Sequence, residues 1–173
     1  MKVVVINGMA RAGKDTFVQL CQKHIFWCYN ISTVDFVKEV AKFCGWNGEK
    51  TSRDRAFLSD LKDLLTEWRD VPYSKVGHEI ELCKARVKSN DYSLNELVIF
   101  VHCREPEEIS RFEVDYDAIT LFISREEAEK GQASNHADAN VRKFTYDCVI
   151  ENNGTIEELE EKAVQFIHEW LDL

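Results

Sequence analysis

The most constraining feature of the sequence is the segment 8–14, which reads Gly-Met-Ala-Arg-Ala-Gly-Lys and directly follows the apolar run Val-Val-Val-Ile of residues 3–6. A β-branched strand, a G-x-x-x-x-G-K loop and a helical pattern in that order are typical of a phosphate-binding loop. Glycines let the backbone wrap around a phosphate, and successive N–H groups at a helix N-terminus bind the anion. We therefore expect such a loop here, rather than a tight turn with a solvated Lys14.

The two residues after Lys14 depart from the common form of this loop. Asp15 stands where Ser or Thr usually holds Mg²⁺, and Thr16 follows it. A carboxylate beside phosphates is repelled unless a metal lies between them. Asp15 is therefore predicted to bind Mg²⁺ or a metal-bound water, or to act as a base near the transferred phosphoryl group, with Thr16 as a second metal ligand. An acid that stabilises the first helical turn through the helix dipole is the alternative, and both roles are compatible.

Composition and charge limit the possible partners. A length of 173 residues with 45% apolar and 31% charged residues indicates one globular domain, covering residues 1–173. We expect no signal peptide and no membrane-spanning segment, because no apolar run approaches about 20 residues. A net charge of −9 disfavours a polynucleotide partner, so a phosphorylated ligand needs a local basic cluster. Six scattered cysteines without a C-x-x-C pair indicate buried thiols in a reducing cytoplasm.

Short apolar runs alternate with helical patterns along the chain. This alternation predicts a three-layer α/β fold, with a five-stranded parallel sheet flanked by helices. The final helix is expected to start with a capping box at Thr155 and Glu158. Ligands in such sheets bind at the carboxyl ends of the strands. Besides residues 3–6, the expected strands are 29–34, 97–101, 118–123 and 146–150.

Residues 53–69 predict a helix with two distinct faces. The side expected to be buried carries Phe57, Leu61, Leu64, Leu65 and Trp68, and a separate basic, hydroxyl-bearing face carries Arg55, Ser59, Lys62, Thr66 and Arg69. In an acidic protein this second face is a candidate site for an anionic substrate, with Arg53, Arg55 and Lys62 as the binding residues. A solvated face with intrahelical ion pairs is the alternative.

Three strand ends carry further candidates. Asp35 is predicted either to cap the following helix or to contact an acceptor hydroxyl or phosphate-bound water. Arg104 follows an apolar strand, where a guanidinium can bind a phosphate through two hydrogen bonds. His102 stands where a Walker B strand usually ends in an acid. Metal binding is therefore expected to rely on Asp15, Thr16 or Asp35.

The polar segment 124–145 lies between two apolar strands and contains Gly131. We interpret it as a lid that closes over nucleotide phosphates and excludes water, which limits wasteful ATP hydrolysis. Its cationic residues are Arg125, Lys130, Arg142 and Lys143.

Residues 8–16 resemble the G-x-x-R-x-G-K-D-T loop of phage-type deoxynucleoside monophosphate kinases, and animal phosphomevalonate kinases carry a similar loop with Lys-Asp. Arg104 and the segment 146–154 are also similar to that group. The resemblance implies the nucleoside-monophosphate-kinase fold, Mg²⁺-ATP as donor and a small phosphorylated acceptor. It places Gly8, Arg11, Ala12, Gly13, Lys14, Asp15 and Thr16 at the donor site, Asn152 and Asn153 near the adenine, Arg104 on phosphate and Arg125 in the lid. Separately, we expect residues 45–95 to form a substrate-binding helical insertion.

These features together predict a cytoplasmic kinase that transfers the γ-phosphoryl group of ATP to a small anionic acceptor. A nucleoside or deoxynucleoside monophosphate is the first choice, and another phosphorylated metabolite is the second. A regulatory nucleotide-binding protein that hydrolyses slowly is an alternative from a different class. A GTPase switch is disfavoured because the chain has no N-K-x-D motif. The base, the sugar and the oligomeric state stay open, a homodimer included.

Overall fold

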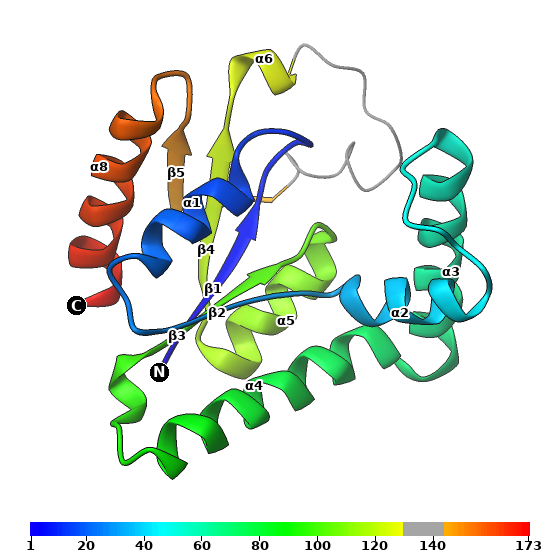
Figure 1. Cartoon of the computed structure of the whole chain (residues 1–173), viewed down its shortest axis with the longest axis horizontal. Helices are drawn as coiled ribbons and strands as arrows, with labels where there is room; N and C mark the ends of the chain where they lie inside the picture. Colours follow the sequence, from blue (N-terminus) through cyan, green and yellow to red (C-terminus); the bar gives the residue numbers. More distant parts are fainter. Residues whose placement is uncertain (130–143) are drawn as a thin grey trace.

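A computed structural model describes residues 1–129 and 144–173. Within these ranges, five parallel strands form one sheet in the order β2-β3-β1-β4-β5 (Figure 1). This arrangement confirms the predicted α/β class with a parallel sheet. The observed strands begin or end within two residues of the predicted ranges. They are β1 (Lys2–Asn7), β2 (Trp27–Ser32), β3 (Leu97–His102), β4 (Ile119–Ser124) and β5 (Cys148–Glu151).

Helices follow the strands and cover both faces of the sheet. The last helix, α8, continues into a π-helical turn over Ile167–Leu171, and a short 3₁₀ turn over Leu94–Glu96 precedes β3. The α-helices are α1 (Lys14–Gln22), α2 (Asp35–Phe43), α3 (Ser52–Arg69), α4 (Val71–Ser89), α5 (Pro106–Tyr116), α6 (Glu126–Glu129) and α8 (Ile156–Phe166).

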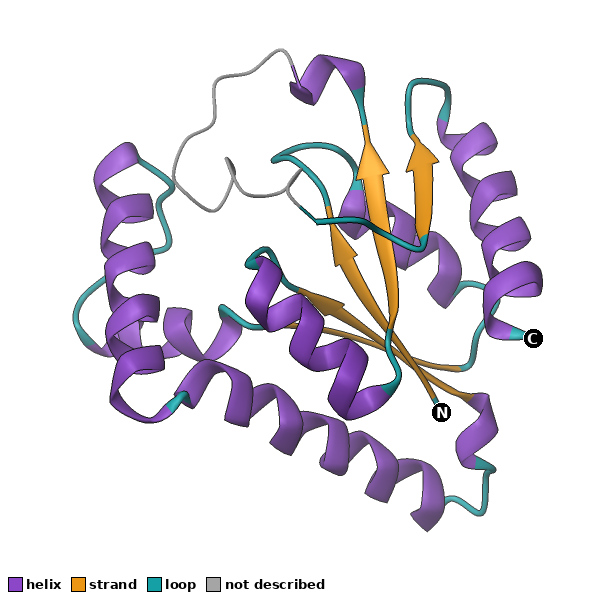
Figure 2. Cartoon of the chain, turned by 180° about the vertical axis from the view of Figure 1, so that it is seen from behind, coloured by secondary structure: helices purple, strands orange, loops and turns teal. Residues whose placement is uncertain are grey.

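Alternation along the strands divides the core into two parts. Val4 and Ile6 of β1 pack with α1 and α8 on the side seen in Figure 1, whereas Val3 and Val5 pack with α4 and α5 on the side seen in Figure 2. Successive side chains of a strand point to opposite faces, so a strand buried on both faces is apolar throughout. This explains why β1 and β3 read as continuous apolar runs.

The region 45–95 divides into two helices with different roles. Helix α4 belongs to the main core, because Val76, Ile80 and Cys83 are buried together with residues of β1 and β3. Helix α3 instead lies at the margin of the molecule, against α2 and α4 (Figure 1). Helix α3 therefore has a peripheral position, whereas α4 is part of the main core.

The predicted burial of the apolar face of α3 is wrong. No residue of α3 is fully buried, and the side chains of Leu64 and Trp68 are 62% and 70% exposed. Leu61 and Leu65 are half-buried, as are Lys62 and Thr66 of the basic face. Helix α3 packs mainly against α2 and α4 rather than against the sheet, so its contact surface is narrow. That surface lies between the two predicted faces.

Two helix starts were predicted with different success. The capping box of Thr155 and Glu158 is confirmed at the start of α8. Asp35 does not cap α2: it is the first helical residue, the preceding Val34 occupies the cap position, and the Asp35 carboxylate accepts a hydrogen bond from the N–H of Ser32 at 2.9 Å. Among the described residues, no helix is long and apolar enough to cross a membrane.

Candidate nucleotide-binding site

The site lies at the carboxyl ends of the neighbouring strands β1 and β3. After β1 the chain enters α1 on one face of the sheet, and after β3 it enters α5 on the opposite face. Adjacent strands whose connections leave to opposite faces create a crevice, which is the usual ligand position in open α/β sheets. The segment 8–14 and the residues after His102 border this crevice.

The loop that follows β1 requires both of its glycines. Gly8 and Gly13 have φ angles of 147° and 98°, which residues with a side chain rarely adopt. A Cβ atom on Gly8 would lie 2.4 Å from the carbonyl oxygen of Ile123, and one on Gly13 would lie 2.3 Å from the Asn152 side chain. Because α1 begins at Lys14, the loop presents its N–H groups together with a helix N-terminus, which favours an anion.

Two asparagine side chains form hydrogen bonds with the backbone of this loop. Buried Asn7 accepts a hydrogen bond from the N–H of Gly8 at 2.8 Å and donates to the Tyr146 hydroxyl at 2.8 Å. Asn152 donates to the carbonyl oxygen of Ala12 at 2.8 Å. Burial raises the pKa of Tyr146 to about 12, so its phenol stays neutral. The contact of Asn152 with the loop was not predicted from the sequence, and the Asn7–Tyr146 contact spans 139 residues and has no local sequence signal.

Lys14 folds back over the loop. Its ammonium group donates hydrogen bonds to the carbonyl oxygens of Gly8 at 2.6 Å and of Met9 at 2.8 Å. The charge therefore lies at the mouth of the loop, where phosphate oxygens can replace the carbonyls as acceptors. Arg11 is exposed on the same loop with a φ of 67°.

The residues present fit a nucleotide-bound Mg²⁺ ion. Asp15 and half-buried Thr16 begin α1, and Asp15 Oδ1 lies 3.6 Å from the Nε2 atom of His102. Within residues 1–129 and 144–173, no cluster of three or more His, Cys, Asp or Glu side chains is placed to hold a metal by itself. Mg²⁺ commonly takes one or two carboxylates and completes its shell with phosphate oxygens and water. The Nε2 atom of His102 is buried and has no hydrogen-bond partner among the described residues.

The predicted acceptor residues come from α2, from α3 and from the segment after β3. Asp35 pairs with Lys38 at 3.1 Å, and Lys62 pairs with Glu108 at 2.7 Å. Arg53 is exposed in the first turn of α3, and Arg55 is half-buried one residue beyond Asp54. Of the three cations on α3 predicted to bind the acceptor, Lys62 is therefore neutralised by a carboxylate, and Arg53 and Arg55 remain as candidates.

The remaining candidates follow the carboxyl ends of β3, β4 and β5. Arg104 is half-buried directly after β3, and its carbonyl oxygen accepts a hydrogen bond from Asn7 at 3.4 Å. Arg125 lies 3.2 Å from Glu127, and Asn153 accepts a hydrogen bond from the N–H of Glu126 at 2.9 Å. Asn153 thus supports the start of α6. The other proposed lid residues, Lys130, Arg142 and Lys143, lie outside the described residues.

Gly13→Ala is expected to abolish nucleotide binding without unfolding the core. The added methyl group meets the Asn152 amide and forces a strained φ, at a cost of about 1–3 kcal/mol concentrated in the loop. Calorimetric titration with ATP measures the loss, and Gly45→Ala is the matched control, because Gly45 also has a positive φ but has open space around its Cβ position. Equal effects of the two substitutions would contradict the role given to Gly13.

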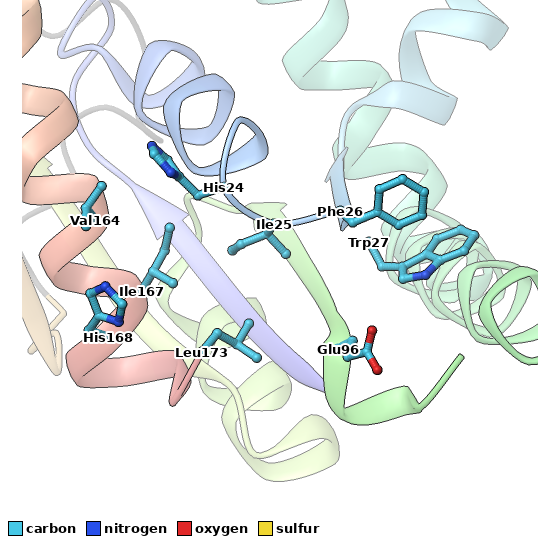
Figure 3. A pocket seen from close by; sticks show the side chains of 9 residues that line it. All are labelled: His24, Ile25, Phe26, Trp27, Glu96, Val164, Ile167, His168 and Leu173. Atoms are coloured by element: carbon cyan, nitrogen blue, oxygen red, sulfur yellow. The ribbon is translucent and has the colours of Figure 1, made fainter. Parts of the chain in front are cut away.

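A separate cavity of about 360 Å³ lies at the opposite end of the sheet (Figure 3). It is lined by residues that precede β2 and β3, such as His24 and Glu96, and by the end of the C-terminal helix. The phosphate-binding loop is at the carboxyl end of β1, so this cavity is not part of the candidate site.

Comparison with known proteins shows the fold. No protein-family model matches the chain, and no curated protein matches it in sequence. Among solved structures, thymidylate kinase from Candida albicans is similar with a TM-score of 0.53 and 12% identity, covering 96% of this chain and 91% of that one. Dephospho-CoA kinase from Campylobacter jejuni gives 0.52 and 13%, covering 99% and 98%. Shikimate kinase from Aquifex aeolicus gives 0.50 and 14%, covering 98% and 99%. The chain has the α/β fold of these P-loop kinases.

Proposed function

We propose that the chain is an ATP-dependent kinase that transfers the γ-phosphoryl group to a small phosphorylated acceptor in the cytoplasm. One observation carries the proposal: the loop 8–13 follows the carboxyl end of β1, requires glycine at both ends, and leads directly into α1 at Lys14. A tight turn alone does not require Lys14 at its mouth. The fold shared with three kinases that act on different small molecules supports the same class of reaction.

Phosphoryl transfer depends mainly on positioning and charge neutralisation, and the chain has groups for both. The loop N–H groups and Lys14 would hold the β- and γ-phosphates. Arg104, at the end of β3, would bind a phosphate across the crevice, and Arg125 would approach from the start of α6. Asp15 and Thr16 would hold Mg²⁺, which supplies charge neutralisation between the phosphates when bound.

A second anion site distinguishes a kinase from a regulatory NTPase. In a chain with a net charge of −9, Arg53 and Arg55 stand on the marginal helix α3, and Arg104 lies at the crevice. These cations favour an acceptor that already carries a phosphate, with a nucleoside or deoxynucleoside monophosphate as the first candidate. A phosphomevalonate-like metabolite is the second candidate, and a slow regulatory NTPase is the alternative that lacks this site.

An acceptor panel tests the proposal. Each candidate monophosphate or phosphorylated metabolite is incubated with Mg²⁺-ATP, and the ADP formed above the acceptor-free rate is measured. The proposal expects one chemical class to stimulate ADP formation strongly. ADP formation that no acceptor changes would favour the regulatory NTPase.

Arg55→Ala is expected to weaken acceptor binding while ATP binding stays nearly unchanged. A guanidinium can form two hydrogen bonds to one phosphate, so Arg55→Lys should restore little of the affinity. Separate calorimetric titrations with ATP and with the stimulating acceptor measure the two effects. Arg86→Ala, at an exposed position of α4, is the control, and an equal loss of both ligands in Arg55→Ala would contradict an acceptor site on α3.

A further inference from the structure

His102 is placed toward the phosphate-binding loop by the alternation of β3. Val98 and Phe100 of this strand pack in the core beneath α1 and α8, so His102, two residues further, is directed to the same face. It pairs in register with Ile6, immediately before the loop begins. The first turn of α1 carries Asp15 over this position. Sheet register and helix position therefore bring His102 and Asp15 together, although 87 residues separate them in the sequence.

The contact between these two side chains is incomplete. The distance from His102 Nε2 to Asp15 Oδ1 is 3.6 Å, which is too long for a hydrogen bond. The Nε2 atom is buried and has no hydrogen-bond partner among the described residues, although the Asp15 side chain is 81% exposed. A buried polar atom without a partner is costly, so an imidazole at this position requires an explanation.

The positions of the two groups suit a shared cation. Nε2 lies 3.6 Å from Asp15 Oδ1, and the two atoms form no hydrogen bond. An imidazole with its proton on Nδ1 presents a lone pair from Nε2, and the carboxylate presents a second acceptor. A cation bound to both atoms would satisfy the two acceptors together.

We propose that His102 and Asp15 are direct ligands of the divalent cation that accompanies the bound nucleotide, and that this site prefers Mn²⁺ or Co²⁺ to Mg²⁺. This inference rests on the proposed nucleotide-binding function. Phosphate oxygens, Thr16 and water would complete the coordination. Mg²⁺ favours oxygen ligands, whereas an imidazole nitrogen raises affinity for later first-row metals. An acid at this strand end would keep the all-oxygen environment, and His102 replaces it.

The test detects the metal–nitrogen bond itself. The full chain is loaded with Mn²⁺ and β,γ-methylene ATP, and electron spin echo envelope modulation is recorded on protein with natural and with ¹⁵N-labelled histidine. The proposal expects a directly coordinated ¹⁴N signal that changes to ¹⁵N on labelling and is absent in His102→Gln. His78→Gln, on the exposed side of α4, is the control and should keep the signal. If His102→Gln does not fold, the isotope substitution in the wild-type protein still decides the result.

Metal affinities give a second readout. Mn²⁺ affinity in the presence of the nucleotide should fall at least about tenfold in His102→Gln, because even outer-shell partners of metal sites contribute 10–100-fold. His102→Asp should restore preference for Mg²⁺. If nucleotide and Mn²⁺ bind but the histidine label leaves the spectrum unchanged, the ligand role of His102 is overturned while the proposed function stands. If the nucleotide does not bind, both proposals fail.

Discussion

Lys14→Ala is expected to lower kcat for phosphoryl transfer by about 100-fold or more, because it removes a preorganised positive charge from the position of the transferring group. The structure places this ammonium group at the mouth of the loop, with hydrogen bonds only 2.6 and 2.8 Å long to the carbonyl oxygens of Gly8 and Met9. The charge is therefore already at the site before a nucleotide arrives.

The same substitution should leave the fold intact, since the buried face of α1 is formed by Phe17, Leu20 and Cys21 and not by Lys14. Steady-state kinetics and thermal unfolding, measured on the same preparations, separate the two effects. Lys42→Ala, at an exposed position near the end of α2, is the matched control. Near-normal turnover in Lys14→Ala would refute the phosphate-binding role of the loop.

Lys62→Met is expected to destabilise the protein by about 3–5 kcal/mol, because it leaves the carboxylate of Glu108 buried without its cation. The two side chains are 12% and 9% exposed, and their charged atoms are 2.7 Å apart. Cys103 also donates a hydrogen bond to the same carboxylate oxygen at 3.2 Å. Burial raises the pKa of the Cys103 thiol well above its usual range, so the thiol keeps its proton and can donate.

The double variant Lys62→Met with Glu108→Leu should recover most of this stability, because replacing both buried charges by apolar groups is often neutral or stabilising. Urea unfolding of both single variants and of the double variant measures the coupling. A loss below about 1 kcal/mol in Lys62→Met would indicate that the pair behaves as an exposed salt bridge. This ion pair connects α3 to α5, so the orientation of Arg55 on α3 is expected to depend on it.

The parts of the fold that follow from local patterns could be predicted from the sequence. The continuous apolar run before Gly8 predicts a strand covered on both faces, and the capping box at Thr155 predicts the start of α8; the structure has both. The loop between Gly8 and Lys14 could also be located, since its glycines and its lysine lie close together in the sequence.

Contacts between distant segments could not be predicted in this way. The Asn7–Tyr146 hydrogen bond, the Lys62–Glu108 pair and the approach of His102 to Asp15 depend on sheet order and helix placement. The prediction of which side of α3 is buried failed for a related reason. Periodicity shows that a helix has an apolar stripe, but the neighbours of the helix decide which side is covered. Around α3 those neighbours leave Leu64 and Trp68 exposed.

Transfer of ³²P from γ-labelled ATP tests the central claim most directly. The wild-type protein and Lys14→Ala are each incubated with the labelled nucleotide, Mg²⁺ or Mn²⁺, and the acceptor that most stimulates ADP formation, and the products are separated. The account predicts that the label appears on the acceptor in the wild-type reaction and that Lys14→Ala forms this product at least about 100-fold more slowly. Label released only as inorganic phosphate, at a rate that no acceptor changes, would contradict it.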